Sequence, residues 1–175
     1  MTALTPAELD ELLRRPILAR LATTRPGGWP SVVPVWIDWD GRHAWVIARA
    51  GSGYLDDVRH EPRVCLSVVD DDDPDRRVQL FCRAVLAGGP APLDGDVLAM
   101  ARRMAQRYEG EAGLDYIDAS ASWPRVLIKL EPERIVSWGS PDWHARYRSG
   151  ETETLPIADP ERDPGPSVDP RSPRP

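Results

Sequence analysis

Short apolar runs separated by turn residues dominate residues 17–88, and several of these runs alternate between apolar and polar positions. A period of two is typical of half-buried strands in an antiparallel sheet. The clearest case has five alternate apolar residues on one face: Val78, Leu80, Cys82, Ala84 and Leu86. The predicted strands are residues 17–24, 31–39, 44–48, 63–69, 77–86, 125–131 and 134–138. We therefore predict a mainly β protein of the α+β class, built on a small antiparallel barrel.

Three segments have helical signals instead. Thr5 and Glu8 have the spacing of a capping box, and Pro16 ends the helix that they begin. A short helix is predicted for residues 52–60, the one helix-compatible segment among the first strands. A third is predicted for residues 94–108, where apolar residues recur on one helical face. We interpret that face as packing on the barrel.

The predicted strand at residues 31–39 is apolar on both faces. Such a strand is covered on both sides, here by the barrel core and by a partner subunit. Pro34 has no backbone N–H to donate, which favours an edge strand or a bulge. Asp40 and Gly41 then form a hairpin turn signal that leads into the next strand.

Composition divides the chain into two parts. Its 175 residues suffice for one domain of ordinary size. The final segment differs, because seven prolines fall in the last twenty positions and large apolar residues are nearly absent there. Such a stretch buries too little surface to offset its ordering entropy. We predict one domain at residues 1–150 and a disordered, proline-rich tail at residues 151–175.

The charge pattern excludes several classes of function. The net charge is −6, which argues against a nucleic-acid-binding protein, because such a protein needs a basic face. No stretch approaches the roughly 18 apolar residues of a membrane span, and the first residues lack a signal-peptide pattern. We expect a cytoplasmic protein with no membrane contact.

Cys65 and Cys82 lie in apolar strand patterns, and we interpret them as buried free thiols rather than metal ligands.

The segment "ARLATTRPGGWPSVVPV", the hairpin and short helix after it, and then "EPRVCLSV" resemble the pyridoxamine phosphate oxidase family of split-barrel flavin and deazaflavin enzymes. Near the C-terminus, "PERIVSWGSPDWHARY" is similar to the end of the family oxidases, where a Trp precedes His-x-Arg. The resemblance implies a six-stranded antiparallel split barrel. It also implies a homodimer with a flavin in each of two grooves between the subunits.

The chain departs from the family where a flavin phosphate binds. The family oxidases have cations at the positions of Val33, Asp38, Gly53 and Tyr54, and this chain has none there. An anion in a groove needs charge-assisted donors. The candidates that remain for cofactor binding lie on three segments of the chain. They are Val33 and Val35 on the predicted strand at residues 31–39; Arg49, Gly51, Ser52 and Tyr54 at the start of the short helix; and Arg77, at a position that the family places near the flavin ring.

By the same resemblance, the C-terminal motif completes the site. Trp138 can cover a ring face, and Arg146 can pair with a phosphate or with the ring edge. His144 is the best candidate for acid–base chemistry, because its ordinary pKa lies near neutrality. The substrate-binding arginine of the family is Asp142 here, so oxidation of pyridoxamine phosphate itself is not expected.

Three functions agree with these residues. The first is an oxidoreductase that uses flavin mononucleotide (FMN) or the deazaflavin coenzyme, with hydride transfer to or from an unknown small-molecule substrate. The second is a non-enzymatic split-barrel protein that has no cofactor and fills its groove with side chains such as Trp36, Tyr54 and Trp138. The third is a tetrapyrrole-binding relative, for which the possible imidazole ligands are His43, His60 and His144.

Overall fold

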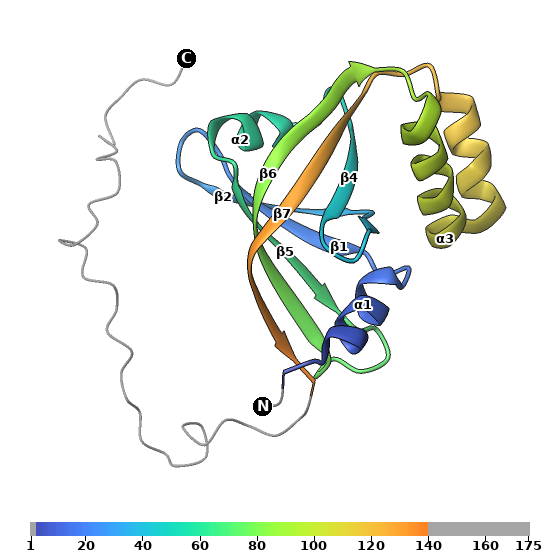
Figure 1. Ribbon diagram of the computed structural model, residues 1–175. Coiled ribbons are helices and arrows are strands. Elements are labelled where there is room, and N and C mark those ends of the chain that lie inside the picture. The colour runs from blue at the N-terminus through green and yellow to red at the C-terminus, as the bar shows by residue number, and fades with distance from the viewer. Residues whose placement is uncertain (1–2, 140–175) are drawn as a thin grey trace, which may run out of the picture. The chain divides into compact units, whose positions relative to one another are not determined.

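The computed structural model describes residues 3–139, and these residues form a strongly bent antiparallel sheet with three helices around it (Figure 1). The helices are α1 (Pro6–Arg14), α2 (Tyr54–His60) and α3 (Gly95–Ser120). The strands are β1 (Ala19–Thr24), β2 (Pro30–Val35), β3 (Asp38–Trp39), β4 (Ala44–Arg49), β5 (Arg63–Val69), β6 (Arg77–Ala91) and β7 (Arg125–Trp138). None of these helices is long and apolar enough to cross a membrane.

The described strands pair in the order β2-β1-β5-β6-β7-β4-β3, and every neighbouring pair is antiparallel. The two edge strands, β2 and β3, do not pair with each other among these residues, so the sheet stays open. The predicted α+β split-barrel class is confirmed. The sheet has seven strands, one more than the family pattern implies, because Trp36 and Ile37 leave the ladder and divide residues 31–39 into β2 and β3.

Two strands are longer than the alternation predicted. β6 continues to Ala91, beyond the last apolar residue of the pattern. Residues 125–131 and 134–138 form one strand, β7, rather than two. A register shift beside Pro132 takes up the irregularity, since Cys82 pairs with Pro132 while Phe81 pairs with Arg134. A bulge of this kind bends a strand without ending it.

The core lies inside the bent sheet. Alternate residues of the strands are fully buried there. The helices α1 and α2 and the link between β2 and β3 add further apolar side chains. The largest fully buried side chains are Leu12, Leu13, Leu21, Ile37, Leu55, Leu66, Leu80, Ile128 and Leu130. Lys129 lies on the other face of β7 and pairs with Glu131 at 2.8 Å. Cys82 is buried and Cys65 half-buried, and both are free thiols, as predicted.

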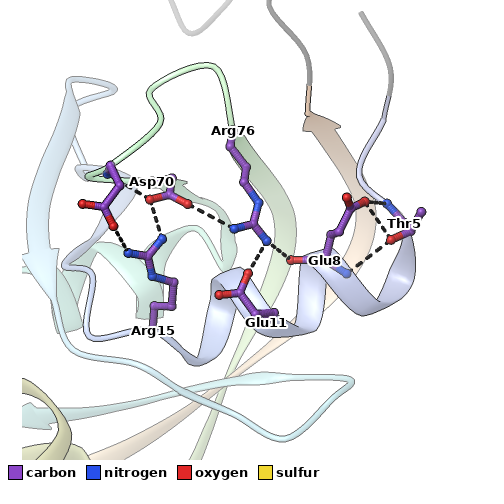
Figure 2. Close-up of polar contacts among 7 residues, drawn as sticks. Thr5, Glu8, Glu11, Arg15, Asp70 and Arg76 are labelled. Atoms are coloured by element: carbon purple, nitrogen blue, oxygen red, sulfur yellow. Dashed lines mark hydrogen bonds and ion pairs between the residues drawn. The ribbon is translucent and has the colours of Figure 1, made fainter.

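Polar contacts hold α1 against the acidic loop between β5 and β6 (Figure 2). The predicted capping box is present, with Thr5 and Glu8 each bonded to the backbone N–H of the other. Asp70 accepts hydrogen bonds from Arg15 at 2.5 Å and from Arg76 at 3.2 Å. The Asp70 side chain is only 2% exposed, because these two guanidiniums enclose it.

α3 differs most from its prediction. The expected helix at residues 94–108 is present, and Ala101, Met104 and Ala105 are buried as the stripe required. The chain then turns at Gly110 (φ 64°, ψ −139°) and continues as a second helical arm to Ser120. Figure 1 shows the two arms side by side. The arms approach closely at Gly113, where an added Cβ would lie 2.6 Å from the carbonyl oxygen of Ala105.

Candidate functional site

A cavity of about 350 Å³ lies between β2, β4 and α3, with the start of α2 and of β7 at its border. Most of its wall is apolar. The lining residues are Leu18, Pro34, Val35, Trp36, Val46, Ile47, Arg49, Ser52, Tyr54, Ala101, Met104, Tyr116, Ile117 and Arg125. The second arm of α3 contributes Tyr116 and Ile117, so the helical hairpin that the sequence did not predict forms part of the site.

The polar part of the wall comes from the ends of two paired strands. Arg49 is the last residue of β4 and Arg125 the first of β7, and the two are register partners. Both guanidiniums approach the hydroxyl of Tyr116. Arg49 donates from Nε at 3.1 Å, and Arg125 donates from Nη2 at 3.3 Å. Two positive charges therefore converge on one oxygen atom at the cavity wall.

Arg125 is buried, with 5% of its surface exposed. Its other hydrogen bonds reach neutral oxygens, the Oγ of Ser120 at 3.0 Å and the carbonyl of Trp123 at 3.4 Å. Within residues 3–139, no carboxylate lies within ion-pair distance of Arg125 or of Arg49. The positive charge at this end of the cavity is thus not neutralised by the described part of the protein.

Two tyrosines report the electrostatics of the cavity. Burial acts to raise the pKa of Tyr116, but the hydrogen bond from Arg49 and the charge of Arg125 outweigh it, so this pKa lies below its ordinary value. For Tyr54 the balance is reversed. Burial dominates and raises its pKa, although a hydrogen bond with Ser52 and the charge of Arg49 act in the opposite direction. Negative charge is therefore favoured at Tyr116.

The structure brings four of the predicted cofactor residues together, since Val35, Arg49, Ser52 and Tyr54 all line the cavity. Gly51 precedes Ser52 in the same turn, whereas Val33 is half-buried against the core. The predicted use of backbone amides is weakened. The N–H of Ser52 already donates to the carbonyl of Arg49 at 2.9 Å, and α2 has only seven residues.

Arg77 and Trp138 lie elsewhere in the same protomer. They are register partners at the far end of β6 and β7, where the Arg77 guanidinium lies 5.3 Å from the Trp138 ring centre. β7 has 14 residues, which at about 3.3 Å per residue separates its two ends by roughly 40 Å along the strand. Neither residue lines the cavity. The predicted residues His144 and Arg146 lie outside the described residues.

At one of the positions where the family has a cation, the carboxylate of this chain pairs with α3. Asp38, which stands at one of those positions, pairs with Arg103 at 3.0 Å and with Arg107 at 3.2 Å. Its charge is therefore neutralised by the first arm of α3 and does not face the cavity.

Sequence reasoning missed Arg125 and Tyr116. The one available signal was an arginine directly after Pro124 at the start of a predicted strand, and its pairing with Arg49 could not be read from it.

The side chains that were expected to fill a groove do not fill this one. Trp36 stacks on Tyr108, with ring centres 5.3 Å apart and planes 9° apart, and this contact holds Trp36 in the wall. Tyr54 also lines the wall, and the cavity remains beside Ser52. This geometry counts against the reading in which the protein has no room for a ligand.

The described histidines lie away from the cavity. His43 contacts Asp40, with Nδ1 and Oδ2 3.3 Å apart, and packs edge-on against Trp45. His60 is the last residue of α2. Neither lines the cavity. Over residues 3–139, no group of three His, Cys, Asp or Glu side chains is arranged to hold a metal ion.

Solved structures with the same fold support the arrangement. An F420 reductase is 27% identical, with a TM-score of 0.57, and the match covers 73% of this chain and 94% of the other. A conserved hypothetical protein from Mycobacterium tuberculosis is 24% identical (TM-score 0.63; 81% and 91% covered). HutZ, the haem storage protein from Vibrio cholerae, is 18% identical (TM-score 0.60; 76% and 94% covered). No curated protein matches the sequence.

The family follows from the sequence as a whole. The family model described as pyridoxamine 5'-phosphate oxidase matches residues 5–139, which is most of the chain and nearly all of its described part. The resemblance inferred from the strand and helix motifs is thereby confirmed. This chain belongs to the pyridoxamine 5'-phosphate oxidase family.

Proposed function

We propose that the protein is a flavin- or deazaflavin-dependent oxidoreductase whose cofactor lies in the cavity beside Ser52. The observation behind this proposal is an apolar cavity with a positively charged end in a member of this family. When bound, such a cofactor supplies hydride exchange at N5 of its ring, or at C5 in a deazaflavin. The protein's own part is to hold the cofactor and to exclude water.

The lining residues fit a planar molecule with an anionic end. A volume of about 350 Å³ is within the range of small-molecule sites. The Trp36 ring is fixed by Tyr108, so it offers a rigid aromatic wall. In the polar part of the wall, Arg49 and Arg125 offer hydrogen-bond donors for a negatively charged group. Ser52 and Tyr54 add hydroxyl groups between these two regions.

The choice between the two cofactors has one support. The F420 reductase is 27% identical, and F420 is a deazaflavin, so this relative favours the deazaflavin. FMN remains the alternative, because the family is defined by a flavin enzyme. Haem is not proposed, since no described histidine lines the cavity and the haem storage protein shares only the fold.

We further propose that two copies of the chain associate through the outer face of the sheet. Phe81 and Val85 on β6 are each 38% exposed, and Val32 on the edge strand β2 is 63% exposed. Exposed large apolar side chains of this kind are typical of a subunit contact. In such a dimer we expect Arg77 and Trp138 to serve the cavity of the partner. Light scattering after size-exclusion chromatography should show a dimer, and Phe81→Asp should shift it to monomer; a wild-type monomer would contradict this.

Cofactor binding is the direct test. The absorption spectrum of the purified protein is recorded, and FMN and F420 are each titrated by fluorescence quenching. We expect saturable micromolar binding of one of them. Leu18→Trp enlarges a half-exposed side chain at the cavity wall and should weaken binding about tenfold. Leu86→Trp is the matched control, because Leu86 is similarly exposed but outside the wall. Absence of saturable binding of either cofactor would reject the proposal.

A further inference from the structure

We propose that Arg125, Arg49 and Tyr116 form a binding site for one phosphate or carboxylate group at the wall of the cavity. The existence of this site depends only on these three residues. That the anion belongs to a molecule held in the same cavity rests on the proposed function.

The burial of Arg125 is the first step of the argument. A buried charge is costly unless a group of opposite charge accompanies it. Two half-buried arginines have such a partner, since Arg76 pairs with Asp70 and Arg107 with Asp38, whereas the half-buried Arg77 donates to the carbonyl of Pro74. Arg125 is more deeply buried than any of the three and bonds only to neutral oxygens among the described residues. A buried cation of this kind is best explained by an anion that arrives with a ligand.

The second step is the proximity of Arg49. Because Arg49 and Arg125 are register partners, the ladder between β4 and β7 fixes two like charges side by side. Their repulsion adds to the cost of burial until an anion lies between them. Guanidinium groups bind phosphate and carboxylate oxygens through paired N–H donors, which suits the pair of arginines to either group.

Tyr116 shows where the anion binds. Its hydroxyl oxygen already accepts from both guanidiniums, at 3.1 Å and 3.3 Å, so the donors are aimed at a shared acceptor. The hydrogen bond from Arg49 and the charge of Arg125 lower the pKa of Tyr116, in keeping with this geometry. A ligand oxygen next to this hydroxyl can accept from the same donors. Tyr116 is therefore a positioning residue, which orients both arginines before the ligand arrives.

The rest of the cavity limits the kind of ligand. Trp36, Ile47, Met104 and Ile117 give its wall an apolar character, and its volume is about 350 Å³. Among the described lining residues, Arg49 and Arg125 are the only cations, so a polyanion would find no further positive charge from residues 3–139. The part of the ligand that this cavity holds has an apolar body and one anionic end. That end belongs either to the cofactor, as a phosphate, or to the substrate, as a phosphate or carboxylate.

Inorganic phosphate and acetate test the site without any cofactor. The full-length, ligand-free protein is titrated with each, and the arginine Nε–H signals are followed by NMR. We expect saturable shifts, with affinity lowered about tenfold in Arg125→Gln and also lowered in Arg49→Gln. Arg134→Gln is the matched control, since Arg134 is exposed and lies outside the wall. Phosphate and acetate affinities that are unchanged in Arg125→Gln would overturn the proposal.

Folding and positioning need separate variants. Arg125→Lys keeps the charge and should retain part of the affinity, whereas a purely structural role predicts equal loss in both variants. Tyr116→Phe keeps the ring and removes the shared acceptor. We expect it to broaden the Nε–H signal of Arg49 and to weaken phosphate binding by a smaller factor than Arg125→Gln. Unchanged binding and unchanged Arg49 signals in Tyr116→Phe would overturn its positioning role.

FMN and riboflavin separate the two sources of the anion. If Arg125→Gln weakens FMN but not riboflavin, the anion is the cofactor phosphate. If it weakens inorganic phosphate and leaves FMN, riboflavin and F420 unchanged, the anion belongs to the substrate. Arginine-dependent phosphate binding without any flavin or F420 binding would support this site and reject the proposed function. Flavin binding, together with phosphate binding that is unchanged in Arg125→Gln, would support the proposed function and reject this site.

Discussion

Two pairs of arginines in this protein lie in opposite electrostatic surroundings. Arg15 and Arg76 enclose Asp70 where α1 meets the loop between β5 and β6 (Figure 2). Arg49 and Arg125 meet at the cavity, and no carboxylate of the described residues lies within ion-pair distance of either. The first pair is neutralised by the protein itself and joins two elements. The second pair leaves positive charge at a cavity, which is useful to a ligand and costly to the fold.

The neutralised pair acts as a connection between distant segments. Arg76 also donates to the carbonyl of Glu8 at 3.0 Å and pairs with Glu11, both on α1. Arg15 reaches Asp70 at 2.5 Å and also pairs with Asp72. These contacts link α1 to a loop more than fifty residues away in the sequence. Changes in this cluster should therefore affect stability and leave ligand binding intact, whereas changes at the cavity should do the opposite.

The largest effect is expected for Asp70→Asn. The substitution leaves two guanidiniums without their shared carboxylate, and breaking such a buried pair costs about 3 kcal/mol. Urea unfolding followed by circular dichroism measures the loss. Asp71→Asn is the control, because Asp71 is an exposed neighbour in the same loop. Equal stability of Asp70→Asn and wild type would show that the cluster is not a structural connection.

Acid should abolish the same contribution. Burial acts to raise the pKa of Asp70, but the backbone N–H of Asp72 and the Arg15 guanidinium outweigh it, so this pKa lies below its ordinary value. The unfolded chain then binds the proton more readily than the folded one. The carboxylate therefore stabilises the fold above about pH 4, and that stability is lost as the pH falls through the folded pKa. The difference in unfolding free energy between wild type and Asp70→Asn should shrink below about pH 4.

Elements that depend on local sequence patterns were predictable, and elements that depend on contacts between distant segments were not. Strands were predictable because alternation is local, and residues 63–69 were predicted with the bounds that β5 has. The second arm of α3 was not, because Gly110 and Gly113 disfavour a helix, although residues 111–120 include apolar positions such as Leu114 and Ile117. That arm is helical because it packs on the first arm at Gly113, a contact that periodicity does not reveal. The predicted hairpin turn at Asp40 and Gly41 and the capping box, which are equally local, were confirmed.

The candidate site shows the same division. Val35, Arg49, Ser52 and Tyr54 were found because they lie at or near the positions where the family oxidases have their phosphate-binding cations. Arg125 was not, because only the β4–β7 register places it beside Arg49, and register between distant strands depends on the whole sheet.

The next largest effect is expected for Gly113→Ala, which should change both the stability of the fold and binding at the cavity. The new Cβ would meet the Ala105 carbonyl at 2.6 Å, so the second arm must move. We expect a net loss of about 1–2 kcal/mol, because the clash exceeds the gain in helix propensity. Since that arm holds Tyr116, phosphate binding should weaken as well. Gly88→Ala, which meets nothing within 4 Å, is the control, and unchanged phosphate affinity in Gly113→Ala would separate the arm from the site.

A smaller effect is expected at the start of α1. Thr5→Ala removes the side chain that accepts from the N–H of Glu8, and loss of such a cap costs about 1 kcal/mol. Thr5→Ser keeps the hydroxyl and should retain most of the stability. Ligand binding should be the same in both variants, because α1 does not line the cavity. Weaker phosphate binding in Thr5→Ala would mean that the two clusters are coupled.

The smallest change in stability, and the sharpest contrast, is expected for Arg125→Met. Methionine fills a similar volume without a charge, and replacing an unpaired buried cation by an apolar side chain removes a desolvation cost. We expect unfolding free energy within about 1 kcal/mol of wild type, together with loss of phosphate binding. Arg76→Met, in the neutralised cluster, should lose stability and keep phosphate binding. If Arg125→Met instead unfolds as readily as Arg76→Met, then Arg125 is held for its hydrogen bonds to Ser120 and Trp123, and the two pairs of arginines serve the fold alike.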